Sequence, residues 1–337
     1  MIAERYYFNK LSSKEKDIYK KLYRAILALE PKVNVFGIIT METIQKIAEA
    51  ITNDNPHLFY FNQSYMLLQT TTTNTVVLPQ YFFNVQEIKT LNKKIEDSVN
   101  KIIQKLDLRN IDDEYEREKR IHDVLAQQVT YDHAAITTKD TRHIATAHSI
   151  VGVFISKNAV CEGIAKAVKI LLNTANIKCI VVTGQATLEA DARHAWNIVK
   201  IDNNSYHLDA TWDIANTSSS LINYDYFNLT DMEVQCDHSG YLGTPVCLSN
   251  DMNYFIKNKL TFAGISEVKK YIKRCLQSNI NSFYFKLLDK QINMKNCVNS
   301  LIQYALSVVV SDGYNWIAHS SYNESQKTAY ITLRVRV

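Results

Sequence analysis

The chain has 337 residues, of which 46% are hydrophobic, and its formal net charge is +4. This length predicts two or three domains rather than one. Lys and Arg are scattered among acidic residues, whereas nucleic-acid-binding proteins concentrate them in a stripe, so we expect no nucleic-acid partner. No apolar run approaches the roughly eighteen residues of a membrane span, and the N-terminus lacks an export signal. We expect a cytoplasmic protein as the sequence stands, or a secreted or cell-surface one if a signal was removed.

The first part of the chain predicts an α+β accessory domain over residues 1–110. Apolar residues at spacings of three and four indicate helices over 12–29 and 41–51. Residues 57–83, with the β-branched run TTTTNTVV, predict strands that include an edge strand or a hairpin. A third helix is expected over 85–106.

The last part of the chain predicts a second α+β accessory domain over residues 249–337. Its expected elements, in order, are a short strand, a helix, a strand, a helix and two terminal strands, with the first four near 260–262, 266–276, 282–287 and 294–305. Between the two accessory domains, residues 111–248 hold every motif that suggests chemistry. We assign them to a separate core domain, whose first helix opens at Asp113 and Glu116.

One motif places a cysteine at the start of a helix. In SKNAVCEGIAKAVKILLN, the apolar residues after Cys161 follow helical spacing, so the thiol lies in the first turn. Unpaired N–H groups and the positive end of the helix dipole favour a thiolate there. Gly163 removes side-chain bulk near the sulfur. Most single cysteines are buried and structural, which is the interpretation that we keep for Cys179, Cys275 and Cys297.

A second motif, HAWNIVKIDNNSYHLDATWD, predicts a β-hairpin that carries a histidine and an aspartate. A carboxylate on the far nitrogen of His194 would set its tautomer and stabilise its imidazolium form, and Asp209 can supply it. A two-residue turn at Asn203 and Asn204 puts both side chains on one face, but four positions apart. This is too far, so we predict a bulge or a longer turn.

Together, VCEGIAKA, HAWN and HLDATWD resemble the transglutaminase-like superfamily, in the branch of bacterial proteins with one core and flanking domains. The resemblance covers residues 131–238. It implies an α+β, papain-like core in which the nucleophile helix packs on an antiparallel sheet. By this resemblance Cys161 is the nucleophile, His194 the general base and then acid, and Asp209 the acid that orients the histidine.

The resemblance leaves part of the site open. Candidates for the oxyanion site or the cleft are Tyr131, His148, Gly163, Trp196 and Trp212, with the backbone N–H of Cys161 as a first donor. As a lone histidine, His148 can equally be structural. Arg193 replaces a small residue of the family pattern and should face away from His194, at the mouth of the cleft.

Other kinds of chemistry find little support in the sequence. Cys236, His238 and Cys247 match no familiar zinc-ligand spacing, and the chain has neither a Gly-rich phosphate loop nor a G-x-S-x-G motif. We therefore expect no metal and no cofactor. The oligomeric state stays open.

A Cys-His-Asp triad attacks an amide carbonyl and passes the acyl group on through a thioester. Protein or peptide substrates are expected. We favour water as the acceptor, which makes a peptidase or amidase, because nothing in the sequence suggests a tunnel for an amine. The alternatives are an amine-transferring transglutaminase and a non-catalytic binding module on the same fold.

Overall fold

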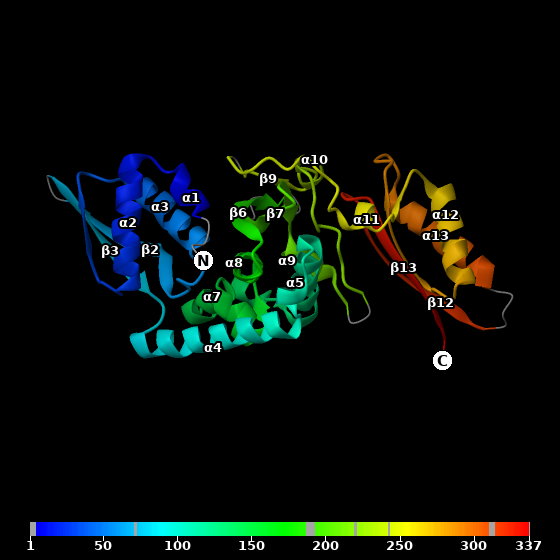
Figure 1. Cartoon of the computed structure of the whole chain (residues 1–337), viewed down its shortest axis with the longest axis horizontal. Helices are drawn as coiled ribbons and strands as arrows, with labels where there is room; N and C mark the ends of the chain where they lie inside the picture. The colour runs from blue at the N-terminus through cyan, green and yellow to red at the C-terminus, as the bar shows by residue number, and fades with distance from the viewer. Residues whose placement is uncertain are drawn as a thin grey trace.

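The computed structural model describes residues 5–70, 73–186, 193–218, 221–241, 243–309 and 314–336. Three regions, each with a sheet and helices, follow one another along an elongated molecule (Figure 1). The mixed helix and strand content confirms the α+β class. None of the helices in the described ranges is long and apolar enough to cross a membrane.

The N-terminal region has helices on a three-stranded antiparallel sheet of order β1-β3-β2. A capping box of Ser12 and Glu15 starts the second helix. Two residues of the predicted threonine run, 71 and 72, lie outside the described residues. The sequence prediction missed β1. The elements are α1 Tyr6–Lys10, α2 Ser13–Leu27, β1 Val33–Phe36, α3 Met41–Asp54, β2 Phe61–Thr70 and β3 Asn74–Tyr81.

The central region has a four-stranded antiparallel sheet of order β8-β7-β6-β9, with α8 packed on β6 and β7. Its long first helix, α4, runs beneath it in Figure 1 and packs against α8. The elements are α4 Val85–Lys105, η1 Leu108–Asn110, α5 Glu114–Gln128, β4 Thr130–Tyr131, α6 Ala134–Thr137, α7 Thr141–Ala147, η2 Gly152–Ser156, β5 Asn158–Ala159, α8 Cys161–Thr174, β6 Lys178–Ala186, β7 Arg193–Ile201, β8 Asn204–Leu208, α9 Ala210–Asn216, α10 Asp231–Val234 and β9 His238–Ser239.

The C-terminal region packs two helices on a sheet of order β10-β11-β13-β12. It has a hydrophobic core of its own, while a larger core extends through the N-terminal and central regions and reaches Phe255, Tyr284 and Tyr330 of the C-terminal region. The helix α4, which the sequence analysis included in the N-terminal domain, packs against η2 and α8 of the central region. The domain limits at residues 110 and 248 stay a proposal. The elements are α11 Tyr254–Lys257, β10 Thr261–Phe262, α12 Ile265–Gln277, β11 Ser282–Leu287, α13 Met294–Val309, β12 Trp316–Asn323 and β13 Thr328–Val335.

The β7–β8 hairpin turns one residue earlier than the sequence suggested. Its turn residues are Asp202 and Asn203, with φ values of 46° and 70°, and Ile201 pairs with Asn204. Asp and Asn tolerate the positive φ that such two-residue turns require. The predicted turn at Asn203 and Asn204 is therefore wrong.

This earlier turn changes the register of the hairpin. The pairing continues regularly to Asn197 and Leu208, so the residue opposite His194 by extension is Thr211. Asp209 thus lies two positions before the residue opposite His194, whereas the sequence analysis placed it four positions away. Diagonal neighbours two positions apart are within reach of a histidine side chain. The paired residues of β7 and β8 follow one register with no shift. The expected bulge or longer turn is wrong.

Gly163 lies where the α8 helix passes close to another backbone. A Cβ atom at this position would stand 2.4 Å from the carbonyl oxygen of Ala147 and 2.8 Å from that of Ser149. Both obstacles are backbone atoms, so neither can move without shifting the chain. Close packing thus requires a glycine here, and this reason differs from the space around the sulfur that the sequence suggested.

We predict that Gly163→Ala lowers the free energy of unfolding by about 1–3 kcal/mol, the usual cost of overpacking, although alanine normally favours a helix. Urea unfolding measures this. Gly264→Ala is the matched control, because a Cβ at Gly264 would meet no atom within 4 Å, so its cost of roughly 0.5–1 kcal/mol reflects only the weaker N-cap preference of alanine. Equal midpoints for both variants would contradict the packing account.

Candidate active site

Cys161 and His194 line one cavity of about 280 Å³ between the N-terminal and central regions. The central region contributes the start of α8 and the start of β7. The N-terminal region contributes the end of α3 and residues such as Gln63 from β2. The cavity therefore joins the predicted nucleophile and base with side chains that the sequence analysis placed in an accessory domain.

The thiol of Cys161 stands at the first residue of α8, as the sequence predicted. The N-cap residue Val160 provides no side-chain cap, so the first amides of α8 remain for other acceptors. Cys161 is partly buried and packs against Ala165, Val181 and Ala195. This environment combines access from the cavity with the positive end of a helix.

His194 and Asp209 form a buried hydrogen-bonded pair. The Nε2 atom of His194 lies 2.8 Å from Oδ2 of Asp209, and the two residues are 7% and 2% exposed. The other carboxylate oxygen, Oδ1, accepts the backbone N–H groups of Thr211 and Trp212 and thereby caps α9. Because Nε2 is engaged, Nδ1 is the ring nitrogen that remains for the thiol of Cys161.

The electrostatics of this pair favour two charged groups. Burial alone lowers the pKa of His194, but Asp209 and hydrogen bonding with Cys161 outweigh it and raise the pKa to about 10. For Asp209, burial opposes ionisation, yet the two histidines beside it hold its pKa well below the usual range. His194 is thus an imidazolium and Asp209 a carboxylate near neutral pH.

A second histidine, which the sequence analysis did not place in the site, bonds the same carboxylate. The Nε2 atom of His238 lies 3.1 Å from Oδ2 of Asp209, and its Nδ1 lies 2.7 Å from Oδ1 of Asp237. All three residues are buried. The only sequence signal was the dipeptide Asp237-His238 near the end of the resemblance, and spacing alone does not connect it to His194.

Aromatic rings surround His194 and His238. Trp196 lies on one side of His194, with ring centroids 6.0 Å apart, and Trp212 lies at 5.5 Å. Trp196 is almost completely buried and donates its indole N–H to Nδ1 of His207. The rings keep water away from the pair, which strengthens its electrostatic interactions.

His148 lines the cavity with Cys161 and forms a hydrogen bond with Glu162, the residue that follows Cys161. Its Nδ1 atom is 3.1 Å from Oε2 of Glu162, while Lys166 and Gln63 donate to Oε1 at 2.6 and 3.2 Å. Burial opposes ionisation of Glu162, but Lys166 and His148 lower its pKa to about 2. Sequence reasoning missed this cluster, although the spacing of Glu162 and Lys166 suits a helical ion pair.

Two other positions singled out in the sequence lie as follows. Tyr131 lines a different cavity, beside Tyr224 and Tyr284, and not the one that contains Cys161. Arg193 is exposed, lines the Cys161 cavity and stands 3.6 Å from Glu49. Its expected orientation away from His194 stays a prediction.

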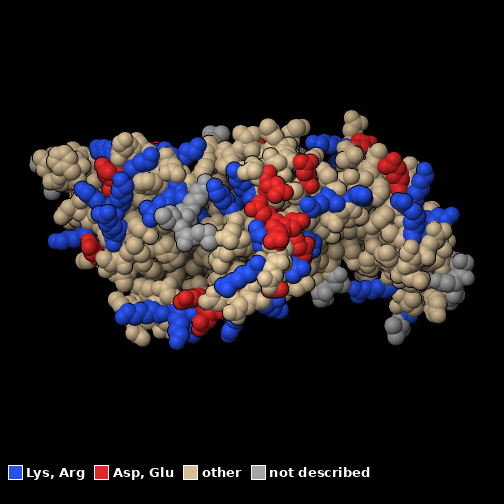
Figure 2. Space-filling view, in the orientation of Figure 1, with Lys and Arg blue, Asp and Glu red and all other residues tan. Residues whose placement is uncertain are grey.

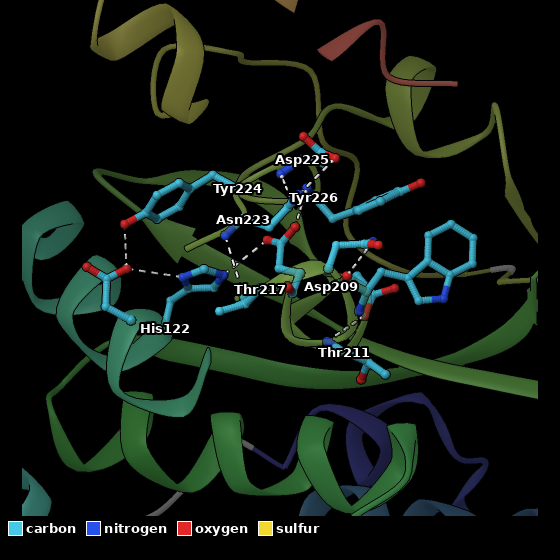
Figure 3. A network of polar contacts seen from close by, with 12 residues as sticks. His122, Asp209, Thr211, Thr217, Asn223, Tyr224, Asp225 and Tyr226 are labelled. Carbon is cyan, nitrogen blue, oxygen red and sulfur yellow. Dashed lines mark hydrogen bonds and ion pairs between the residues drawn. The ribbon is translucent and has the colours of Figure 1, made fainter. Parts of the chain in front are cut away.

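A network of buried polar contacts holds the helix that Asp209 caps (Figure 3). Asp213, in α9, lies 3.0 Å from Nε2 of His122 in α5 and accepts the backbone N–H of Tyr226. The carbonyl of Tyr226 in turn accepts the N–H of Asp209. Burial lowers the pKa of His122, but Asp123 and Asp213 raise it to about 9. The network therefore fixes α9, and with it Asp209, against α5.

Two groups of side chains have atoms within 4.8 Å of one another, as in a metal site: His194, Asp209 and His238, and His207, Asp231 and Cys247. In both groups each histidine Nε2 atom lies within hydrogen-bond distance of the carboxylate of the same group. Neither group in the described ranges contains Cys236, which is exposed. The structure therefore does not bring together Cys236, His238 and Cys247, the set considered in the sequence: His238 is in one group, Cys247 is in the other and Cys236 is in neither.

Charge on the outer surface is mixed. On the face in Figure 2, Lys and Arg side chains are spread along the molecule, while acidic side chains gather near its middle.

Comparison with known proteins agrees with the motifs. Residues 102–210 match the transglutaminase-like superfamily. The resemblance is thus confirmed over a segment that contains Cys161, His194 and Asp209, and that begins earlier and ends earlier than the motifs suggested. No curated protein matches the chain at a significant level.

Two solved structures also resemble the chain. A crystal structure of a TGase is 16% identical and covers 56% of this chain, at a TM-score of 0.32. The chain spans 52% of that protein. A candidate cysteine protease from Cytophaga hutchinsonii is 15% identical and covers 44% of this chain and 61% of its own, at a TM-score of 0.28.

The raised pKa of His194 predicts a pH dependence of stability. A histidine whose pKa rises from 6.5 to about 10 on folding adds stability below pH 6.5, and this contribution disappears as the pH rises through about 10. We expect the unfolding free energy of the wild type to fall toward that of His194→Gln over this range. Urea unfolding at several pH values measures it. A constant difference between the two proteins would contradict the assigned charge.

Proposed function

We propose that this protein is a cysteine-dependent acyl-transfer enzyme that acts on amide bonds of protein or peptide substrates and passes the acyl group to water. The observation that carries the proposal is the His194–Asp209 pair, which is buried beside a cavity that also contains Cys161. The match of residues 102–210 to the transglutaminase-like superfamily supports the same chemistry. We assign Cys161 as nucleophile, His194 as base and then acid, and Asp209 as the orienting carboxylate.

The first half of the reaction forms a thioester. In the resting pair the thiol proton is already on Nδ1 of His194, and the thiolate of Cys161 attacks the amide carbonyl. The resulting oxyanion accepts a hydrogen bond from the backbone N–H of Cys161, which stands at the uncapped start of α8. When the carbon–nitrogen bond breaks, the imidazolium of His194 protonates the departing amine, and the acyl group stays on sulfur.

The second half regenerates the enzyme. His194, now neutral, removes a proton from water, which attacks the thioester carbonyl; sulfur departs and the carboxylic acid is released. Asp209 stabilises the imidazolium in each half. For the second oxyanion donor we propose His148, because it lines the cavity with Cys161. Its Nδ1–H is used by the carboxylate of Glu162, so its Nε2 donates to the oxyanion when the ring is an imidazolium.

The acceptor defines the finer activity. If the amine of a lysine replaces water, the same thioester makes an amide cross-link, which is the alternative proposal. Incubation with a peptide library and a labelled amine, followed by mass spectrometry, distinguishes cleaved products from amine incorporation. We expect cleavage. A binding module without activity is the second alternative, and the paired His194 and Asp209 argue against it.

We predict that iodoacetamide alkylates Cys161 at neutral pH at least about tenfold faster than any other cysteine, because an ordinary thiol is only a few per cent ionised there. Cys236 is the internal comparator, since it is exposed, whereas the remaining four cysteines are buried. Peptide mapping by mass spectrometry measures each rate. Equal and slow labelling of all six would refute the proposed catalysis.

The variant His194→Ala tests whether His194 is the partner that makes Cys161 reactive. It should slow the alkylation of Cys161 toward the rate of Cys236 and leave Cys236 itself unchanged, because the ion pair is lost while the fold persists. Circular dichroism checks the fold. If labelling of Cys161 does not change, the two residues are not partners.

A further inference from the structure

The carboxylate of Asp209 has a second histidine on the same oxygen that His194 uses. Oδ2 lies 2.8 Å from Nε2 of His194 and 3.1 Å from Nε2 of His238. The two rings are tilted against each other with centroids 5.4 Å apart. A triad needs only one histidine on its acid. The role of the other is therefore open.

His238 stands between two carboxylates. Its Nδ1 atom lies 2.7 Å from Oδ1 of Asp237, so both ring nitrogens face acceptor oxygens. A neutral imidazole carries a single N–H and can donate to one of them only. Both hydrogen bonds form together when His238 is an imidazolium. Burial opposes this charge, yet Asp209 and Asp237 raise its pKa.

The remaining surroundings of His238 offer no other carboxylate among the ring and hydrogen-bond contacts of the described residues. Trp212 lies at 4.4 Å between ring centroids, Trp196 at 4.9 Å and Tyr226 at 5.8 Å, and all three side chains are uncharged. Among the described residues, His194 is the cationic ring in contact with it, and His207, whose pKa burial lowers, is coupled to it electrostatically. The positive charge is thus held in a largely apolar cage, where electrostatic effects are strong.

Residues from the C-terminal region contact Asp237, the second carboxylate beside His238, either directly or through Tyr226. Oδ2 of Asp237 accepts the hydroxyl of Tyr226 at 2.8 Å and the amide of Gln326 at 3.3 Å. Asn323, at the end of β12, donates to the same tyrosine oxygen at 3.0 Å. The turn between β12 and β13 therefore holds Asp237 in place, and Asp237 in turn holds His238.

We propose that His238 is a positioning residue of the triad, an imidazolium that fixes the Asp209 carboxylate from behind and keeps a positive charge within reach of the Cys161–His194 pair. The inference rests on the proposed function. Because Oδ2 of Asp209 has hydrogen bonds with both His194 and His238, it keeps its position when His194 moves toward the leaving group. The extra positive charge also favours the thiolate.

The test is the pH profile of Cys161 alkylation by iodoacetamide, from about pH 4 to about pH 9, in the wild type and in His238→Gln. Glutamine keeps a donor but removes the charge. We expect the acid limb of the profile to move up by about one pH unit, which corresponds to roughly tenfold slower labelling on that limb. A merely structural role would lower the whole profile without moving the limb.

His207→Gln is the matched control. His207 is also a buried histidine of the same sheet region and lies 2.8 Å from a carboxylate, that of Asp231, but it does not bond Asp209. Its acid limb should coincide with that of the wild type. A limb that moves equally in both variants would overturn the inference, because loss of any nearby histidine would then suffice.

The outcomes separate this inference from the proposed function. If Cys161 of the wild type labels no faster than Cys236, the catalytic proposal fails. If it labels fast but the profile of His238→Gln coincides with that of the wild type, only the role of His238 fails. Should this variant not fold, ¹⁵N NMR of histidine-labelled wild type decides: we expect His238 with both nitrogens protonated near pH 7, and a neutral ring would overturn the proposal.

Discussion

The buried carboxylate of Asp209 is the constraint on which the site depends. Removing a carboxylate from water is costly, and an ion left without partners would take up a proton instead. Here both oxygens have donors: two histidines on Oδ2, and the backbone N–H groups of Thr211 and Trp212 on Oδ1. Asp209 therefore stays charged and unable to rotate, so the ring of His194 has one defined orientation.

The regions around the core each reach the site by a different route. From the N-terminal region, Gln63 contacts Glu162, the residue next to Cys161, across the cavity. From the C-terminal region, Gln326 contacts Asp237 behind the histidines. One flank thus shapes the space that a substrate would enter, and the other stabilises the groups behind the chemistry. This division gives both flanks a physical connection to the reactive centre.

Much of the local structure could be predicted from the sequence because it depends on short-range patterns. Helical spacing predicted the helix that begins at Cys161, and the strands on both sides of the Asp202 turn were recognised. The turn itself was misplaced by one residue, since Asp202, Asn203 and Asn204 all suit a turn, and that single step changed the inferred offset of the pair. His238 could not be connected to Asp209, because their contact depends on how β9 joins the sheet beside β6.

Trapping of the acyl-enzyme tests the central claim most directly. An activated ester such as 4-nitrophenyl acetate would be mixed with the protein at mildly acidic pH, and intact-protein and peptide mass spectrometry would locate the acyl group. The account predicts one acyl group on Cys161, removable by hydroxylamine, and almost none on His194→Ala. An acyl group on other residues only, or equal labelling of Cys161 with and without His194, would contradict it.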